Sequence, residues 1–271
     1  MERSATVQEM ADRKHVLTEL GLGVELDGDD LIGRAAITPP MHVPGTDVLR
    51  TSVLVAWADT VTGLLCTGIV APRVPVTLDL TLELCRVPHA VSEITLTGRI
   101  IKSSKSAMIA EADIDADGEP LAISTATFMT ANDPGRALPE LPSLAQLIDM
   151  LNVPRPKLEV PLVERAGCDR LRPGVAALRK TDEGLNASNT ISGGLLALVA
   201  EEAALSAAPG TTLLSLAIRY LRPARVGPVV ATARMQDDLS RIEVRDTGKD
   251  DRLVVVATSR SAPVDPAGGD R

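Results

Sequence analysis

Two long apolar runs, each interrupted near its middle by acidic residues, dominate the hydrophobic pattern of this chain. Residues 50–68 (RTSVLVAWADTVTGLLCTG) carry Asp59, and residues 192–208 (SGGLLALVAEEAALSAA) carry Glu201 at the corresponding place. A surface helix normally has a charged face opposite its apolar stripe, and neither run has one. We therefore predict two helices enclosed by protein, each with an acid that must be paired, hydrated or functional. We interpret Glu202 as a solvated neighbour of Glu201.

Alternation of apolar and polar residues predicts antiparallel strands on both sides of each helix. The expected strands fall in residues 20–39 (two strands with an Asp-Gly turn), 76–87, 91–103, 107–114, 120–130, 175–180, 212–221, 229–235, 242–246 and 252–259. The order of one helix followed by four strands occurs twice. The second copy has six fewer residues between its helical acid and the arginine of the next strand (Glu201 to Arg222) than the first copy has (Asp59 to Arg86). Doubly wound folds alternate strand and helix, so this order predicts an α+β fold instead.

The repeat divides the chain into two units. We expect an N-terminal repeat over residues 1–131, a proline-rich linker with a short helix at 143–151 over residues 132–161, a C-terminal repeat over 162–262 and a flexible tail over 263–271.

Composition narrows the possible functions. The net charge of −8 disfavours a partner that is a nucleic acid or an anionic membrane. One Trp, one Tyr and one Phe leave no platform for stacking bases, so aliphatic side chains must line any buried pocket. The three cysteines show no metal-binding spacing, and we expect no metal site. With no apparent signal peptide and no uninterrupted membrane span, we expect a cytoplasmic protein.

The second helix begins with a recognisable motif. Residues 189–194 read NTISGG, and Glu201 follows Gly193 by eight residues. This resembles hotdog-fold acyl-CoA thioesterases of the phenylacetate-pathway and 4-hydroxybenzoyl-CoA group. Their motif is an Asn, then His-Gly-Gly at the start of the helix, then Asp or Glu eight residues after the first Gly. Here Ser192 replaces the histidine.

The first repeat keeps only part of this motif. It has Asp47 in place of the Asn and residues 50–52 (RTS) in place of His-Gly-Gly, but it retains the acid as Asp59. The resemblance covers nearly the whole chain as a tandem, or double, hotdog, in which a curved antiparallel sheet wraps around a long central helix in each repeat. It also implies association into a homo-oligomer of such double units.

In this family the active sites lie between paired hotdog units, so the resemblance implies two unequal sites. The complete one combines Asp59 with Asn189, Gly193 and Gly194, and Thr62 is placed to orient a water molecule or the carboxylate. The second, degenerate one combines Glu201 with Asp47, Arg50 and Thr51.

The chemistry of these groups agrees with thioester hydrolysis. Unpaired amides at a helix N-terminus polarise a carbonyl oxygen, and a carboxylate in an aliphatic pocket attacks directly or activates water. We expect no separate cofactor, since coenzyme A is part of the substrate. Candidates for holding its phosphates are Arg86, Arg222, Lys102 and Lys105, although each of these residues alone is better explained as a solvated charge at the edge of a sheet.

The leading hypothesis is therefore an acyl-CoA thioesterase of fatty acid metabolism. A non-catalytic acyl-CoA binding module is the alternative, because one site has lost its motif. A hydratase or dehydratase on the same fold ranks lower, because it needs a histidine near a central helix and the sequence places none there. We interpret Trp57 as a core residue.

Overall fold

The described part of the chain forms one continuous antiparallel sheet of twelve strands. The computed structural model describes residues 14–104, 106–131 and 140–264, so residues 1–13, Lys105 and most of the predicted tail lie outside it. The strands are β1 (Gly23–Asp27), β2 (Asp30–Ala36), β3 (Pro75–Leu84), β4 (Glu93–Ser103), β5 (Met108–Ala116), β6 (Glu119–Thr130), β7 (Cys168–Arg172), β8 (Val175–Leu178), β9 (Thr211–Tyr220), β10 (Val229–Gln236), β11 (Leu239–Asp246) and β12 (Arg252–Pro263).

The order of strands across the sheet is β1-β2-β4-β5-β6-β3-β9-β12-β11-β10-β8-β7, which reads the same from both edges when each half is numbered from its own start. The halves join where β3 pairs with β9, with Leu80 opposite Ile218 and Leu82 opposite Leu216. All four of these side chains are buried. The seam is therefore part of the hydrophobic core, and the two halves share one sheet.

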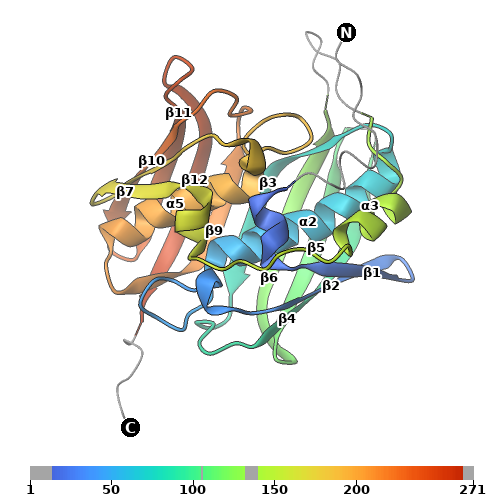
Figure 1. The fold of residues 1–271 in the computed structure, drawn as a ribbon, viewed down its shortest axis with the longest axis horizontal. Coiled ribbons are helices and arrows are strands. Elements are labelled where there is room, and N and C mark those ends of the chain that lie inside the picture. The colour runs from blue at the N-terminus through green and yellow to red at the C-terminus, as the bar shows by residue number, and fades with distance from the viewer. Residues whose placement is uncertain (1–13, 105, 132–139, 265–271) are drawn as a thin grey trace.

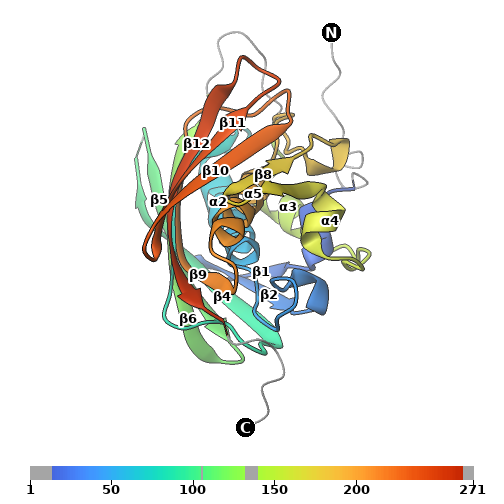
Figure 2. The ribbon, with the colours of Figure 1, turned by 90° about the vertical axis from the view of Figure 1, so that its left-hand side faces the viewer.

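Two long helices lie on the concave face of this sheet, as Figure 2 shows. Helix α2 (Thr51–Val70) belongs to the first half and α5 (Gly193–Ala207) to the second, and they pack against each other as well as against the strands. Most residues of both helices are buried, 15 of 20 in α2 and 13 of 15 in α5, which explains why their sequences lack a charged face. The α+β fold predicted from the sequence is confirmed.

Shorter elements cover the helices from the other side (Figure 1). The 3-10 helix η1 (Val16–Leu20) and the two short helices of the central segment, α3 (Leu144–Leu151) and α4 (Leu162–Ala166), lie over the helical layer. Ser143 and Gln146 form a capping box that starts α3. At its other end, the side chain of Asn152 accepts from the Val24 N–H at 2.9 Å and donates to the Val24 carbonyl at 2.8 Å, which fastens α3 to the edge strand β1.

Among the described residues, α2 alone has the length and composition of a membrane-spanning helix. However, 72% of the most apolar 18-residue stretch of this helix is buried inside the fold. The sheet and α5 account for its apolar character.

Candidate active site

A cavity of about 750 Å³ lies between the two halves of the molecule. Its walls come from one face of α2, the start of β3, the end of β6 and the segments around the first turn of α5. Most of the lining is apolar, and the polar groups include Asp59, Thr77, Ser192 and Tyr220. The expectation of an aliphatic lining was wrong, because Trp57, Phe128 and Tyr220 all line the cavity. A cavity of this size and composition suits a ligand with an apolar chain and one reactive polar group.

Asp59 is the acid that faces this cavity from α2. Its Oδ1 atom accepts a hydrogen bond from the Thr77 hydroxyl at 2.7 Å. Burial raises the pKa of Asp59 to about 6, and the hydrogen bond from Thr77 opposes that rise only in part. An acid with such a pKa is ionised at neutral pH and basic enough to accept a proton from water.

The first turn of α5 lies directly beside this carboxylate. A Cβ atom added to Gly193 would stand only 3.3 Å from Asp59 Oδ2, so the glycine backbone and the acid are neighbours. No side chain caps this helix, because the N-cap residue Ser192 makes no side-chain capping hydrogen bond. The first amides of a helix have no partner within it and carry partial positive charge. The site thus brings a carboxylate from one half beside the helix N-terminus of the other.

Glycine is needed at both positions of this turn. At Gly194 an added Cβ would lie 2.7 Å from the Cβ of Ala56 and 2.8 Å from Cδ1 of Leu17, so any side chain would push α5 away from α2. At Gly193 it would lie 3.1 Å from the Tyr220 hydroxyl oxygen. Gly194 therefore brings the helices together, and Gly193 leaves room for the polar groups of the site.

Two polar residues of this site were not anticipated from the sequence. Tyr220 ends β9 and donates a hydrogen bond from its hydroxyl to the Gly193 carbonyl at 3.1 Å. Burial, followed by the charge of Asp59, raises the pKa of Tyr220 well above its ordinary value, so the hydroxyl stays protonated. Thr77 lies just before a bulge in β3, a feature that redirects side chains. The only sequence signal for either residue is that Tyr220 is the single tyrosine.

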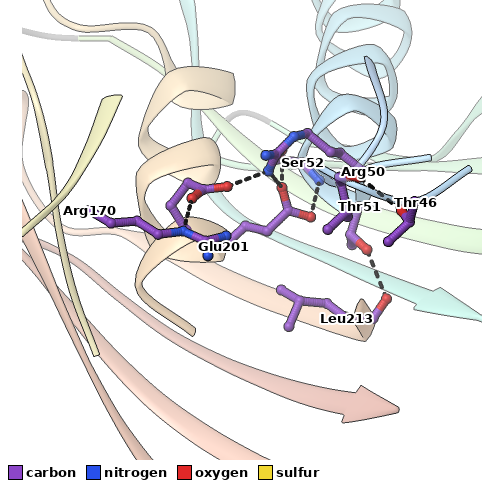
Figure 3. Close-up of polar contacts among 9 residues, drawn as sticks. Thr46, Arg50, Thr51, Ser52, Arg170, Glu201 and Leu213 are labelled. Atoms are coloured by element: carbon purple, nitrogen blue, oxygen red, sulfur yellow. Dashed lines mark hydrogen bonds and ion pairs between the residues drawn. The ribbon is translucent and has the colours of Figure 1, made fainter. Parts of the chain in front are cut away.

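The corresponding helix start in the first half is filled by an ion pair (Figure 3). The guanidinium of Arg50 lies 3.0 Å from Glu201 Oε2, and both side chains are fully buried. Ser52 donates to the same carboxylate twice, from its hydroxyl at 2.6 Å and from its backbone N–H at 3.3 Å. The Ser52 N–H at this helix start therefore donates to the Glu201 carboxylate and is not free for a ligand oxygen.

Glu202 is part of this ion pair network, so its interpretation as a solvated residue was wrong. It is 2% exposed and lies 2.6 Å from Arg50 and 2.6 Å from Arg170. Burial works against its charged form, but the two guanidinium groups, Arg50 first, outweigh burial and hold the pKa of Glu202 below its ordinary value. The two carboxylates likewise outweigh burial at Arg50 and raise its pKa.

Comparison with known proteins identifies the architecture. Neither a protein-family model nor a curated protein sequence matches the chain. Solved structures do: an acyl-ACP thioesterase from Bacteroides thetaiotaomicron has a TM-score of 0.60 at 15% identity and covers 86% of this chain and 98% of its own. A tesB protein of Mycobacterium avium subsp. paratuberculosis has a TM-score of 0.60 at 12% identity, with coverage of 92% and 98%.

A third similar structure is a conserved protein with a hot dog fold from Alicyclobacillus acidocaldarius, with a TM-score of 0.56, 15% identity and coverage of 94% and 100%. This chain has the double hotdog fold. At these identities the similarity is one of fold, and it confirms the architecture expected from the motif.

Two of the expected site residues do not reach the cavity of this double hotdog. The hydroxyl of Thr62 donates to the Ala58 carbonyl at 2.6 Å, and the side chain is fully buried in the core, so Thr77 and not Thr62 holds the carboxylate. Asn189 is exposed at the left-handed position of a turn, with φ of 56°. It is the neighbouring Asn186 that lines the cavity, and its side-chain oxygen accepts from the Thr190 N–H at 3.2 Å.

The residues expected around Glu201 in the degenerate site are also dispersed. Thr51 is buried and donates from its hydroxyl to the Leu213 carbonyl at 2.8 Å. Asp47 lies at the surface, where it pairs with Nδ1 of His89 at 3.0 Å, and that hydrogen bond is the main reason that the pKa of Asp47 is lowered. Arg50, by contrast, is the centre of the ion pair network.

Of the basic residues expected to hold coenzyme A, only Arg222 lines the cavity; Lys105 lies outside the described residues. Arg86 and Lys102 are exposed near strand ends and do not line the cavity. Their positions agree with the alternative that they are solvated charges at the edge of the sheet. Trp57 is 2% exposed, as expected of a core residue, and it also lines the cavity, as does His15. Within the described residues, no group of three or more His, Cys, Asp and Glu side chains is placed to hold a metal ion.

Proposed function

We propose that this protein is a thioester hydrolase that cleaves an acyl-CoA to the free acid and coenzyme A at one site per chain. The observation that carries the proposal is the apposition of Asp59 and Gly193 inside a largely apolar cavity. Hydrolysis of a thioester requires a base for water on one side of the carbonyl and donors for the developing oxyanion on the other. The two halves supply one group each.

The first step follows from the positions of these groups. The acyl chain lies in the cavity with its carbonyl oxygen at the first amides of α5, and Asp59 takes a proton from a water molecule. The water oxygen bonds to the carbonyl carbon, and the amides stabilise the resulting oxyanion. Because Tyr220 bonds to the Gly193 carbonyl and Thr77 to Asp59, both reacting groups are held in place before the substrate arrives.

The second step completes the reaction. The tetrahedral intermediate collapses, the carbon–sulfur bond breaks, and the thiolate of coenzyme A takes up the proton that Asp59 had accepted. Arg222 at the cavity wall is the residue we assign to the coenzyme A phosphates. The carboxylate is then regenerated for the next cycle.

The binding-module alternative is separated from this proposal by one experiment. Thiol release from acyl-CoAs of two to eighteen carbons should occur with the wild-type protein, and Asp59→Asn should lower kcat/KM by about 10²–10⁴-fold because the base is lost. Glu201→Gln is the matched control: it neutralises the other helical acid and should change kcat/KM of the folded protein by less than about fivefold, since that site holds no substrate.

Circular dichroism of each variant confirms that folded protein is compared. Absence of thiol release across the panel would support the binding module. Equal losses in the two variants would refute the assignment of a single site.

A further inference from the structure

We propose that Gly63 determines the length of the acyl chain that the cavity accepts. The proposal rests on the acyl-CoA ligand proposed above and extends it to a specificity-determining residue. Gly63 lies four residues after Asp59, on the same face of α2, and both residues line the cavity. It is the next position of this face, one turn from Asp59 toward the C-terminal end of α2.

The cavity continues past Gly63 as an apolar arm. Thr67, one further turn along, also lines it, so the lined face of α2 extends about 12 Å beyond Asp59 at 1.5 Å per residue. The opposite walls of this part are hydrophobic: they are Val74, Phe128, Met129, Leu141 and Leu151. A polar or branched acid would leave this surface unfilled, whereas a long alkyl chain would cover it.

Packing does not explain why residue 63 is a glycine. A Cβ added there would lie 3.6 Å from Cε1 of Phe128, an ordinary van der Waals contact. Two other glycines of this half differ: a Cβ on Gly98 would lie 2.4 Å from Val61, and one on Gly68 would lie 3.0 Å from Leu144. Glycine in the middle of a helix lowers helix stability relative to alanine. A glycine that packing does not require, and that faces the cavity, is explained by the space it leaves open.

The far wall of the arm is held firmly enough to set a limit. The Leu141 N–H donates to the Pro72 carbonyl at 2.8 Å, and Asn152 fastens α3 to β1 through the backbone of Val24. Leu144 of α3 packs against Gly68 of α2. Because this wall is fixed, a side chain added at residue 63 would shorten the arm and would not simply push the wall outward.

Binding can be measured without turnover, because the single tryptophan, Trp57, lines the cavity and reports an entering acyl chain by its fluorescence. Butyryl-, octanoyl- and palmitoyl-CoA are titrated into Asp59→Asn protein and into the same protein with Gly63→Val or Gly63→Ala. Gly63→Val should weaken palmitoyl-CoA binding at least about tenfold and butyryl-CoA binding less than about threefold, given what one methylene is worth in an apolar pocket. Gly63→Ala, whose methyl group takes up part of the same space, should weaken palmitoyl-CoA binding less than Gly63→Val does, by about threefold, and should leave butyryl-CoA binding almost unchanged.

Equal weakening at all three chain lengths, or unchanged palmitoyl-CoA binding by folded Gly63→Val protein, would overturn the proposal. If Gly63→Val does not fold, Thr67→Leu tests the same arm one turn deeper, and it should weaken palmitoyl-CoA binding while sparing octanoyl-CoA; equal effects on both would again overturn it. Because the readout is binding, it is independent of hydrolysis. Absence of thiol release from the wild type would refute the proposed activity and leave the chain-length result standing.

Discussion

The two helix starts of this double hotdog show how one arrangement can serve two purposes. At the start of α5, Gly193 and the shorter acid Asp59 lie side by side and line a cavity. At the start of α2, the longer acid Glu201 reaches the Ser52 N–H itself, and Arg50 fills the remaining space. One extra methylene in the acid and one arginine in place of a small residue accompany the change from a helix start beside a cavity to one filled by a buried ion pair.

The largest expected difference between the two sites is in stability. Arg50→Met should lower the free energy of unfolding by about 3–5 kcal/mol, because it leaves Glu201 and Glu202 buried without their shared cation. Urea denaturation at constant m-value measures the change. The matched control is Arg34→Met, which removes an exposed pair with Glu25 and should cost about 0–1 kcal/mol. Similar losses in the two variants would show that the buried network is not structural.

At Asp59, by contrast, removal of the charge should stabilise the protein. Because burial raises the pKa of Asp59 to about 6 from 3.8, the ionised acid destabilises the folded state at neutral pH. The contribution of Asp59 to stability is therefore most favourable below about pH 4 and declines as the pH rises to about 6. Asp59→Asn should raise the free energy of unfolding by about 2–3 kcal/mol at pH 8. Most of this gain should vanish at pH 4, and a destabilised variant at pH 8 would contradict the account.

The hydrogen bond from Thr77 gives a smaller, directional test. We expect kcat/KM to rise with pH through about 6, as Asp59 ionises. Thr77→Val removes a donor that lowers the pKa of Asp59, so this rise should move upward by about one pH unit. The control is Thr62→Val, whose hydroxyl bonds only to the Ala58 carbonyl and should leave the profile in place. If Thr62→Val shifted the pH profile and Thr77→Val did not, Thr62 would be the residue that orients the carboxylate, as assigned from the sequence.

The smallest effect is expected at Asn189. Because this side chain is exposed in a turn and lies outside the cavity lining, Asn189→Ala should change kcat/KM less than about twofold. Asn186→Ala provides the comparison, since Asn186 lines the cavity and holds the loop through Thr190. A loss of about tenfold or more from Asn189→Ala would mean that the motif asparagine acts at the site after all.

The sequence predicted the elements well because their signals are local. The apolar run at 50–68 became α2 (Thr51–Val70), and the alternating segment at 120–130 became β6 (Glu119–Thr130). The strand β7 (Cys168–Arg172) was missed, because most of its side chains are exposed and it shows no apolar alternation. Short edge strands give little pattern to detect.

The site was less predictable, because its contacts join distant parts of the chain. Glu202 looked solvated, since nothing near it in sequence shows that Arg50 lies against it in the fold. Thr77 is eighteen residues from Asp59 and contacts it only because β3 runs back beside α2. Thr62 failed for a local reason: a threonine in a helix can satisfy its hydroxyl on the preceding turn. The spacing of residues within the helices therefore pointed to Asp59, Gly193 and Gly194. It gave no sign of their polar partners Thr77 and Tyr220.

The number of ligands bound per chain tests the contrast between the two helix starts most directly. Titration calorimetry with a non-hydrolysable thioether analogue of a long-chain acyl-CoA should give one binding site per chain. Gly193→Val should abolish this site, because its side chain would meet Tyr220 and Asp59 at the helix start. Two equivalent sites per chain, or one site that survives Gly193→Val and is lost with Glu201→Gln, would contradict the account.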